Sequence, residues 1–305
     1  MRVFLNPHCN YGMSRTRWQK IEKELYQRIG DFNLEEIHSI DGFPEQVAKA
    51  IKNEARILIS AGGDGSVHLL LNAIMNLQAQ KNILIGAVGL GSSNDFHKPF
   101  RDEAYIKDVP VRIDWENAKP CDVIRIDYQD DQGVFQSRFS LLNASIGLTA
   151  QANALFNSQP LFLKIIRNVS VDAAIIACAL KTILSYRHIP CLLTVDNQIE
   201  QEFLVTNLGI IKSPHFAGSL CYDIVPDNGL LGVNLCFGMS LFERIGILMA
   251  LARHRFQGYP KTHSWFSRQV LVNSKQVFAL EMDGEVVMAQ RVRFSLIPEA
   301  VRCCQ

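Results

Sequence analysis

Apolar residues in the N-terminal part of the chain alternate between short continuous runs and stretches with a helical period. The short runs, which are typical of buried parallel strands, lie at 3–5, 34–38, 56–60 and 83–90. The helical stretches repeat apolar residues three and four positions apart, most clearly at Trp18, Ile21, Leu25 and Ile29 and at Val67, Leu70, Leu71, Ile74 and Met75. Ser14 is placed to cap the first helix, Gly30 to end it, and Pro44 to begin the second. This order predicts a parallel sheet with helices on both faces.

The pattern changes to strand-like alternation near residue 117. The stretches "CDVIRIDYQDDQGVFQSRFSLLNASIGL", "CLLTVDNQIEQEFLVTNLG" and "RQVLVNSKQVFALEMDGEVV" each predict strands with short connections, which favour antiparallel pairing. Helical stretches interrupt the strands near 161–186 and 240–256. The predicted fold class is therefore α/β plus β, with one domain over 1–116 and a second over 117–305, whose residues 291–305 can pack back on the first.

Composition and charge narrow the class of protein. The chain has 305 residues, 48% of them hydrophobic, and a net charge of +1, which gives no overall bias toward nucleic acid. The sequence does not open with a secretory pattern, and its longest apolar segments, near 173–184 and 245–252, are too short or interrupted to span a bilayer, so a cytoplasmic location is expected. The eight cysteines form no CxxC pair and are expected to be reduced, with the Cys303–Cys304 pair exposed at the tail.

The stretch "SAGGDGSVHLLLNAI", residues 60–74, predicts a strand that enters a glycine turn and then a helix. Such a turn lies at the carboxyl edge of a parallel sheet, where folds of this class bind ligands. Glycine backbone N–H groups and the helix N-terminus can hold phosphate, although the sequence fits neither GxGxxG nor the P-loop. Asp64 suits a phosphate site if a metal ion or a hydrogen-bond donor lies beside it. The alternative is a tight turn in which Asp64 caps the helix.

A second polar turn, "GLGSSNDFHKPF" at 89–100, follows the next predicted strand. Because neighbouring parallel strands end at the same edge of a sheet, we expect the two turns to lie side by side. Asn6 ends the first strand at the same edge. Three polar turns at one edge predict a ligand site rather than a feature of packing alone.

Four motifs carry a resemblance to a known family. "NPHCNYG", "GGDGSVHLLLNAI", "VGLGSSNDF" and "MDGE" occur in the order and approximate spacing of the diacylglycerol kinase catalytic domain family, which is related to sphingosine kinases and NAD kinases. The chain resembles most the bacterial soluble lipid kinases of this family. The resemblance implies a Rossmann-like N-terminal domain, a C-terminal antiparallel β-sandwich, and ATP and Mg²⁺ in the cleft between them.

The resemblance also implies functional residues. The nucleotide-binding residues are Asn6, Ser39, Gly62, Gly63, Asp64, Gly65, Ser66, Val67, His68, Gly91, Ser92, Ser93, Asn94 and Asp95, with His38 as the alternative to Ser39. The catalytic residues are Asp283, Glu285 and Asp64, the general base being drawn from the late "DGE" element. Asp283 is favoured as the base because a turn before glycine holds it rigidly. The plain alternative for "MDGE" alone is a hairpin turn.

Two stretches depart from the family pattern. "NLGIIKSPHFAGSLCYD", 207–223, stands where the family has a more glycine-rich stretch. In "PDNGLL", 226–231, Asn228 stands where an aspartate is expected, and a neutral ligand binds Mg²⁺ less tightly. The metal-binding residues that the resemblance implies are Asp227, Asn228 and Leu230.

The predicted function is an ATP-dependent lipid kinase that transfers the γ-phosphate to the hydroxyl of diacylglycerol or a similar membrane lipid. One alternative is an enzyme like NAD kinase, which shares GGDG but has an Asn-Glu pair where this chain has Asn94-Asp95. The other is a nucleotide- or lipid-binding protein without catalysis. The expected partner is a membrane lipid, met reversibly at the bilayer surface, and not nucleic acid; a homodimer is left open.

Overall fold

The computed structural model describes residues 1–305 except 159, 161–162, 164–165, 167–170, 225 and 227–228. The chain forms two compact units. Unit 1 comprises Met1–Val123 and Pro298–Gln305, and unit 2 comprises Ile124–Ile297. The division therefore falls at 123/124, where the sequence predicts 116/117, and the last eight residues lie with the N-terminal unit.

Unit 1 contains parallel strands connected by helices. The strands β1 (Arg2–Leu5), β2 (Asn33–Glu36), β3 (Ile57–Gly62) and β4 (Leu84–Gly89) run parallel in the order β2-β1-β3-β4. The helices are α1 (Ser14–Ile29), α2 (Phe43–Lys52) and α3 (Asp64–Asn76), with short turns η1 (Cys9–Gly12), η2 (Asp95–His97) and η3 (Asp102–Ala104). Strand β6 (Val109–Arg112) pairs antiparallel with β4 and with the short β5 (Tyr105–Ile106). The sheet is therefore mixed, which corrects the prediction of a wholly parallel one.

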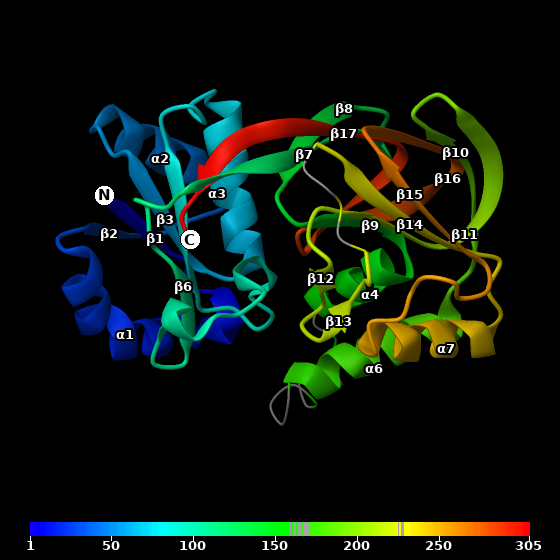
Figure 1. Ribbon diagram of the computed structural model, residues 1–305, viewed down its shortest axis with the longest axis horizontal. Helices are drawn as coiled ribbons and strands as arrows, with labels where there is room; N and C mark the ends of the chain where they lie inside the picture. Colours follow the sequence, from blue (N-terminus) through cyan, green and yellow to red (C-terminus); the bar gives the residue numbers. More distant parts are fainter. Residues whose placement is uncertain (159, 161–162, 164–165, 167–170, 225, 227–228) are drawn as a thin grey trace. The chain divides into compact units, whose positions relative to one another are not determined.

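The helices of unit 1 cover both faces of its sheet. Successive apolar side chains of β1 point to opposite faces, so each face is buried against a helix. Val3 and Leu5 pack in one core with Trp18 of α1. Phe4 points to the other face, where its ring meets Phe43 of α2 edge to face at 5.1 Å between centroids. Figure 1 shows α1 on one side of the strands and α2 and α3 on the other.

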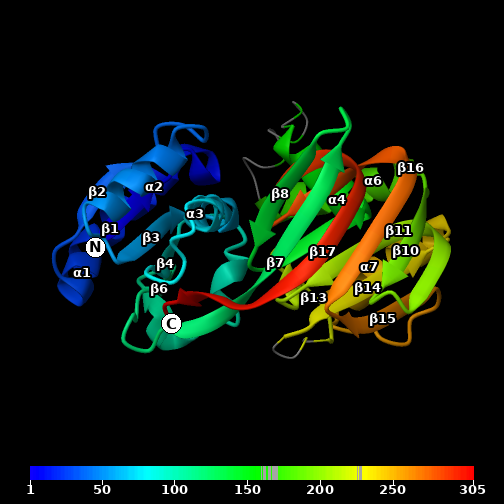
Figure 2. The same cartoon turned by 90° about the horizontal axis from the view of Figure 1, so that it is seen from above.

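Unit 2 is mainly antiparallel. Its larger strands are β7 (Lys119–Asp130), β8 (Phe135–Ser140), β9 (Asn143–Gly147), β10 (Ile189–Val195), β11 (Ile199–Ile211), β14 (Leu231–Phe237), β15 (Thr262–Ser267), β16 (Gln269–Met282) and β17 (Glu285–Cys303). A small hairpin joins β12 (His215–Phe216) and β13 (Leu220–Cys221), and the helices are α4 (Leu148–Asn157), α6 (Val171–Ser185) and α7 (Leu241–Ala252). The strands β8, β7, β17 and β16 lie side by side in that order (Figure 2).

The strands of unit 2 enclose one large core. β9 and β10 each pair with both β11 and β16. The opposite edges of β11 and β16 pair with β14 and β17, so β9 and β10 lie one after the other between β11 and β16. Ile146, Leu193, Val205 and Leu280 are buried in the same core. The predicted antiparallel strands are thus present in one continuous hydrogen-bonded sheet, and the sandwich arrangement stays a prediction.

Three local predictions differ from the structure, and a fourth falls partly outside the described residues. Ser14 does not cap α1, because Met13 holds the N-cap position and the Ser14 hydroxyl donates to the carbonyl of Asn6 at 2.8 Å. Helix α4 lies where the sequence predicted no helix, and the helix predicted at 161–186 is described only as α6, since most of 161–170 lies outside the described residues. Cys303 and Cys304 are fully buried rather than exposed, because the last residues pair with β4.

Candidate functional site

The two glycine turns of unit 1 touch each other backbone to backbone. Gly62 at the end of β3 is paired in register with Gly89 at the end of β4, which brings the following turns side by side. A methyl group built on Gly91 would lie 2.5 Å from the Cα of Gly63, and one on Gly63 would lie 3.2 Å from the Cα of Gly91. At position 91 only glycine fits without a shift of the backbone, and a side chain at position 63 would crowd the same contact.

Asp64 holds the second turn in place. One of its carboxylate oxygens accepts the backbone N–H of Asp95 at 3.0 Å, and the other accepts that of Phe96 at 2.9 Å. The N-cap position of α3 is Gly63, so Asp64 does not cap its own helix. The Asp64 carboxylate in the first turn therefore accepts the backbone N–H groups at the start of η2, which gives this residue a structural role.

Asn94 organises the second turn from within. It has a left-handed backbone (φ 49°), and its buried side chain bonds three times to the turn itself. Its amide nitrogen donates to the carbonyls of Gly89 and Gly91, and its oxygen accepts the N–H of Gly91 at 3.0 Å. Asp95, the next residue, forms an ion pair with Lys98 at 2.6 Å that is largely shielded from solvent. Both side chains are buried and bonded within this turn.

Asn6 joins the end of β1 to the first glycine turn. Its side-chain amide donates to the Ser66 hydroxyl at 2.9 Å, and its backbone N–H donates to the carbonyl of Ala61. A methyl group on Gly62 would lie 2.2 Å from that hydroxyl oxygen, so Gly62 makes room for Ser66. The structure therefore brings together three of the polar turns that the sequence places at one edge.

The remaining predicted residues lie around these turns. Val67 and His68 are buried in the first turns of α3, so their side chains point into the protein. Ser92 is exposed. Ser39 is exposed beyond β2, where its hydroxyl accepts the N–H of Gly42 at 3.0 Å. His38 is exposed next to it.

Two titratable groups beside the turns stay neutral at physiological pH. Burial raises the pKa of the Cys9 thiol, which lies against Gly63, to about 11. Burial, and to a smaller extent the Arg112 guanidinium, lowers the pKa of His97 to about 3. The Cys9 thiol and the His97 imidazole therefore add no charge to those of Asp64, Asp95, Lys98 and Arg17 beside the turns.

Arg17 is a neighbour of the site that the sequence did not single out. It lies in the first turn of α1, and its guanidinium donates to the carbonyl of Gly91 at 3.1 Å and to that of Asp108 at 3.4 Å. The charge stands beside the second glycine turn, where it favours an anion. Its position in sequence, far from either glycine motif, gave no signal of this contact.

In unit 2, the side chain of Asp283 is enclosed by hydrogen-bond donors. Its Oδ1 accepts from the Ser140 hydroxyl at 2.5 Å and from the N–H groups of Leu142 and Asn143, and its Oδ2 accepts from the N–H of Leu141. Asp283 has φ 48° and is 6% exposed. The carboxylate anchors the turn between β8 and β9.

Glu285 differs from Asp283 in its surroundings. Asp283 and Gly284 form the two-residue hairpin between β16 and β17, and both have positive φ, as the favoured hairpin turns require. Glu285 follows as the first residue of β17 and is exposed. A buried carboxylate that the sequence missed, Glu281, accepts from Ser145 and from the N–H of Gly284, both at 2.7 Å. Of the acids near this turn, Glu285 is the one open to solvent.

Two of the three residues predicted to hold a structural metal, Asp227 and Asn228, lie outside the described residues. The carbonyl of the third, Leu230, accepts a hydrogen bond from Lys212 Nζ at 3.0 Å. This metal site stays a prediction. Within the described ranges, no group of three His, Cys, Asp or Glu side chains could hold a metal ion.

Comparison with known proteins supports the resemblance that the four sequence motifs carry. Residues 1–126 match the family model of the diacylglycerol kinase catalytic domain. A Staphylococcus epidermidis protein named "Putative lipid kinase" is 22% identical over 264 residues, which cover 83% of this chain and 80% of the relative.

Two solved structures from Bacillus anthracis have a similar fold. One, titled "A putative diacylglycerol kinase", has a TM-score of 0.71 at 15% identity and covers 99% of this chain and 96% of its own. The other, described as a diacylglycerol kinase, has a TM-score of 0.65 at 14% identity and covers 99% and 95%. At these identities, the likeness shows the fold alone.

Proposed function

We propose that this chain, which carries a diacylglycerol kinase-like catalytic domain over residues 1–126, is a lipid kinase that transfers the γ-phosphate of ATP to the hydroxyl of diacylglycerol or a similar membrane lipid. ATP enters as its magnesium complex, so the magnesium at the reacting phosphates is part of the substrate. The nucleotide binds at the two glycine turns of unit 1, and the lipid binds in unit 2.

The observation that carries the proposal is the contact between Gly63 and Gly91. Two turns that approach this closely offer backbone N–H groups at the start of α3, where the helix leaves its first N–H groups without intrahelical partners. Arg17 adds a positive charge at the same place. Phosphoryl transfer depends mainly on holding and neutralising phosphate oxygens, and these groups are of the kind that does so.

The acceptor hydroxyl also needs a base. We assign this role to the late Asp-Gly-Glu turn, and within it to Glu285, which is exposed. Asp283 remains the alternative that the sequence favours, and its carboxylate accepts four hydrogen bonds from the turn at 140–143. The turnover of variants at both positions separates the two roles.

The surface of unit 2 supports a lipid acceptor. Ile176, Leu180 and Leu184 recur every four residues on α6 and are 57%, 43% and 69% exposed, so one face of this helix is apolar and open. On the adjacent helix α7, Phe242 is 83% exposed and Met249 is 51% exposed. Such faces suit reversible contact with a bilayer surface. None of the described helices is both long and apolar enough to cross a membrane.

The test is phosphate transfer from labelled ATP to a panel of acceptors in mixed micelles. The panel includes diacylglycerol, sphingosine, ceramide and, as a soluble acceptor, NAD. We expect a labelled lipid with wild type and with Lys81→Gln, a control in the exposed turn before β4, and none with Gly91→Ala. A labelled NAD product would favour the alternative of an NAD kinase. ATP binding without any product would favour a binding protein that lacks catalysis.

A further inference from the structure

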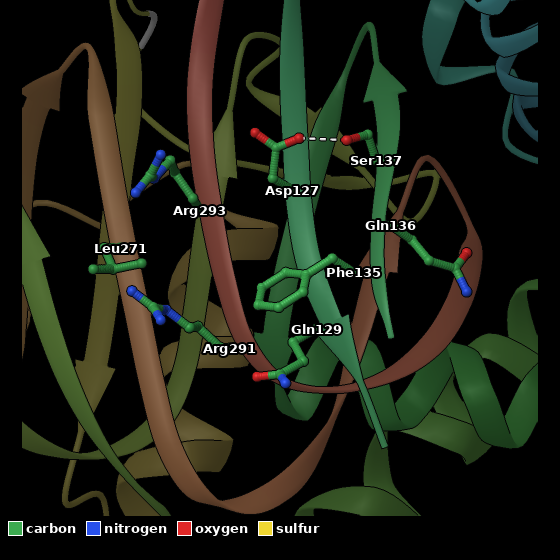
Figure 3. Close-up of a pocket in the computed structure, with 8 residues that line it drawn as sticks. All are labelled: Asp127, Gln129, Phe135, Gln136, Ser137, Leu271, Arg291 and Arg293. Carbon is green, nitrogen blue, oxygen red and sulfur yellow. Dashed lines mark hydrogen bonds between the residues drawn. The ribbon is translucent and has the colours of Figure 1, made fainter. Parts of the chain in front are cut away.

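Unit 2 has a second candidate binding site on the outer face of its sheet. A cavity of about 420 Å³ lies over β8, β7, β17 and β16. Its lining residues are Asp127, Gln129, Phe135, Gln136, Ser137, Leu271, Arg291 and Arg293, and Figure 3 shows them. The volume is within the range of small-molecule sites, about 300–1,000 Å³.

Strand alternation explains why polar residues gather here. On β17, Val292 and Phe294 are buried in the core of unit 2, so Arg291 and Arg293 point to the opposite face. The same alternation places Asp127 and Gln129 of β7 outward, between buried neighbours. Nothing about the core requires two arginines at these positions.

The charge of the cavity is positive. Among the described residues, Arg291 and Arg293 have no carboxylate within ion-pair distance, and their partners across to β16 are neutral, since Arg293 lies opposite Leu271. The lining carboxylate, Asp127, is engaged by Arg125 at 3.0 Å and by the Ser137 hydroxyl at 2.5 Å. Two like charges about 7 Å apart along one strand repel each other, and an anion between them removes that repulsion.

An aromatic ring lies beside the two arginines. Phe135 is 70% exposed, and Figure 3 shows its ring extending from β8 across β7 toward Arg291. Gln129, opposite Phe135 in the β7–β8 pairing, places its amide at the same end of the cavity. Leu271 adds an apolar surface on the far side, on β16. The cavity thus combines a site for an anion with a site for a flat or apolar group.

We propose that this cavity binds a phosphate monoester whose organic part is aromatic or apolar. The phosphate is held by Arg291 and Arg293, whose planar guanidinium groups pair with phosphate oxygens through two N–H donors each. The organic part lies against Phe135 and Leu271. The lining comes entirely from unit 2, so this site is separate from the glycine turns and does not depend on the proposed kinase activity.

Calorimetry with simple probes tests the proposal. Phenyl phosphate carries both parts, inorganic phosphate carries the charge alone, and benzyl alcohol carries the ring alone. We expect phenyl phosphate to bind best and benzyl alcohol not to bind. The double variant Arg291→Gln/Arg293→Gln should bind phenyl phosphate and inorganic phosphate with affinities lower by roughly tenfold or more, because hydrogen bonds to charged groups are strong. Phe135→Ala should weaken phenyl phosphate only.

Controls separate this cavity from other anion sites. Arg268→Gln removes one exposed arginine of the same unit outside the cavity and should leave binding unchanged. The double variant leaves the glycine turns intact, so its difference from wild type reports on the cavity. Equal phosphate binding by wild type and the double variant, with circular dichroism showing both folded, would overturn the proposal, as would no binding by wild type.

Competition with vesicles identifies the source of the phosphate. Vesicles of phosphatidylcholine with phosphatidic acid are compared with pure phosphatidylcholine vesicles. If only the former displace phenyl phosphate from wild type, the site takes a lipid headgroup. If neither displaces it, the site takes a free phosphate ester.

Discussion

Replacing Asp283 by asparagine separates a structural role from a catalytic one. The side chain has nearly the same shape, and asparagine also tolerates the left-handed backbone at φ 48°, so the turn itself is not strained. The change replaces Oδ2 by an NH₂ group that faces the N–H of Leu141, now 3.0 Å from Oδ2. Two donors then oppose each other, and the charge that strengthens the three bonds to Oδ1 is gone.

The cost follows from those bonds. A hydrogen bond to a charged group contributes about 1.5–3 kcal/mol, and a buried N–H left unpaired costs about 1–3 kcal/mol. Because Asp283 is buried, solvent does not restore the lost partner. We expect Asp283→Asn to lower the free energy of unfolding by about 3 kcal/mol, allowing for partial relaxation of the turn. In urea this appears as a lower midpoint at an unchanged slope.

Glu285→Gln is the matched control, because it makes the same chemical change two residues away at an exposed position. Its free energy of unfolding should change by less than about 0.5 kcal/mol. If Glu285 is the base, this stable variant should lose turnover by about 10²–10⁴-fold while it still binds ATP. An Asp283→Asn protein that unfolds at the wild-type midpoint yet has lost turnover would refute our argument and make Asp283 the base.

Three further predictions concern unit 1. Asp64→Ala should abolish phosphate transfer and weaken ATP binding measured by calorimetry, because the N–H groups of Asp95 and Phe96 in the second glycine turn lose their carboxylate acceptor. Unchanged turnover would show that the glycine turns are not part of the active site. Gly91→Ala should unfold at a lower urea concentration and fail to bind ATP, because its methyl group would lie 2.5 Å from the Cα of Gly63. Normal ATP binding by this variant would show that the contact between the two turns is not needed. Burial holds His97 neutral with a pKa of about 3, whereas the same side chain in the unfolded chain takes up a proton near pH 6.5, so the free energy of unfolding should decrease as the pH falls below about 6.5. His97→Gln should make this decrease smaller in thermal melts recorded from pH 7 to 5. Identical pH profiles for wild type and variant would contradict this assignment.

The local pattern of the sequence predicted the elements of unit 1 well. Alternating apolar runs and helical periods gave all four parallel strands and all three helices to within a few residues, because the helices bury one face and the central strands bury both. The pattern could not give β6 its antiparallel pairing or bring Cys303 into the core, because both depend on contacts between distant parts of the chain. The same limit applies to unit 2, where β9 pairs with two strands that are distant from it in the sequence.

For the candidate site, residue type gave the location better than the role. Glycines at 63 and 91 are explained by the close approach of two backbones, and the structure contains that contact, whereas Gly62 makes room for the Ser66 side chain. The acidic residues allow several roles, and a sequence does not show which donors surround a carboxylate. Arg17 was missed because its contact with the second turn spans 74 positions in the chain.

Asp64 and Asp283 were both predicted to be catalytic, and both hold a neighbouring turn through its backbone N–H groups. A carboxylate used in this way fixes the main chain accurately, which is what binding phosphate through backbone donors requires. It is a weak candidate to take a proton, because its lone pairs are already directed at donors. In the proposed reaction we therefore expect the acid–base step to fall to an exposed group such as Glu285, and we expect a variant that loses only this residue to keep nucleotide binding. The turnover of Glu285→Gln, measured together with its ATP affinity, therefore tests this role. A loss of turnover at unchanged ATP affinity indicates that Glu285 is the base, and unchanged turnover indicates that the proton leaves by another route.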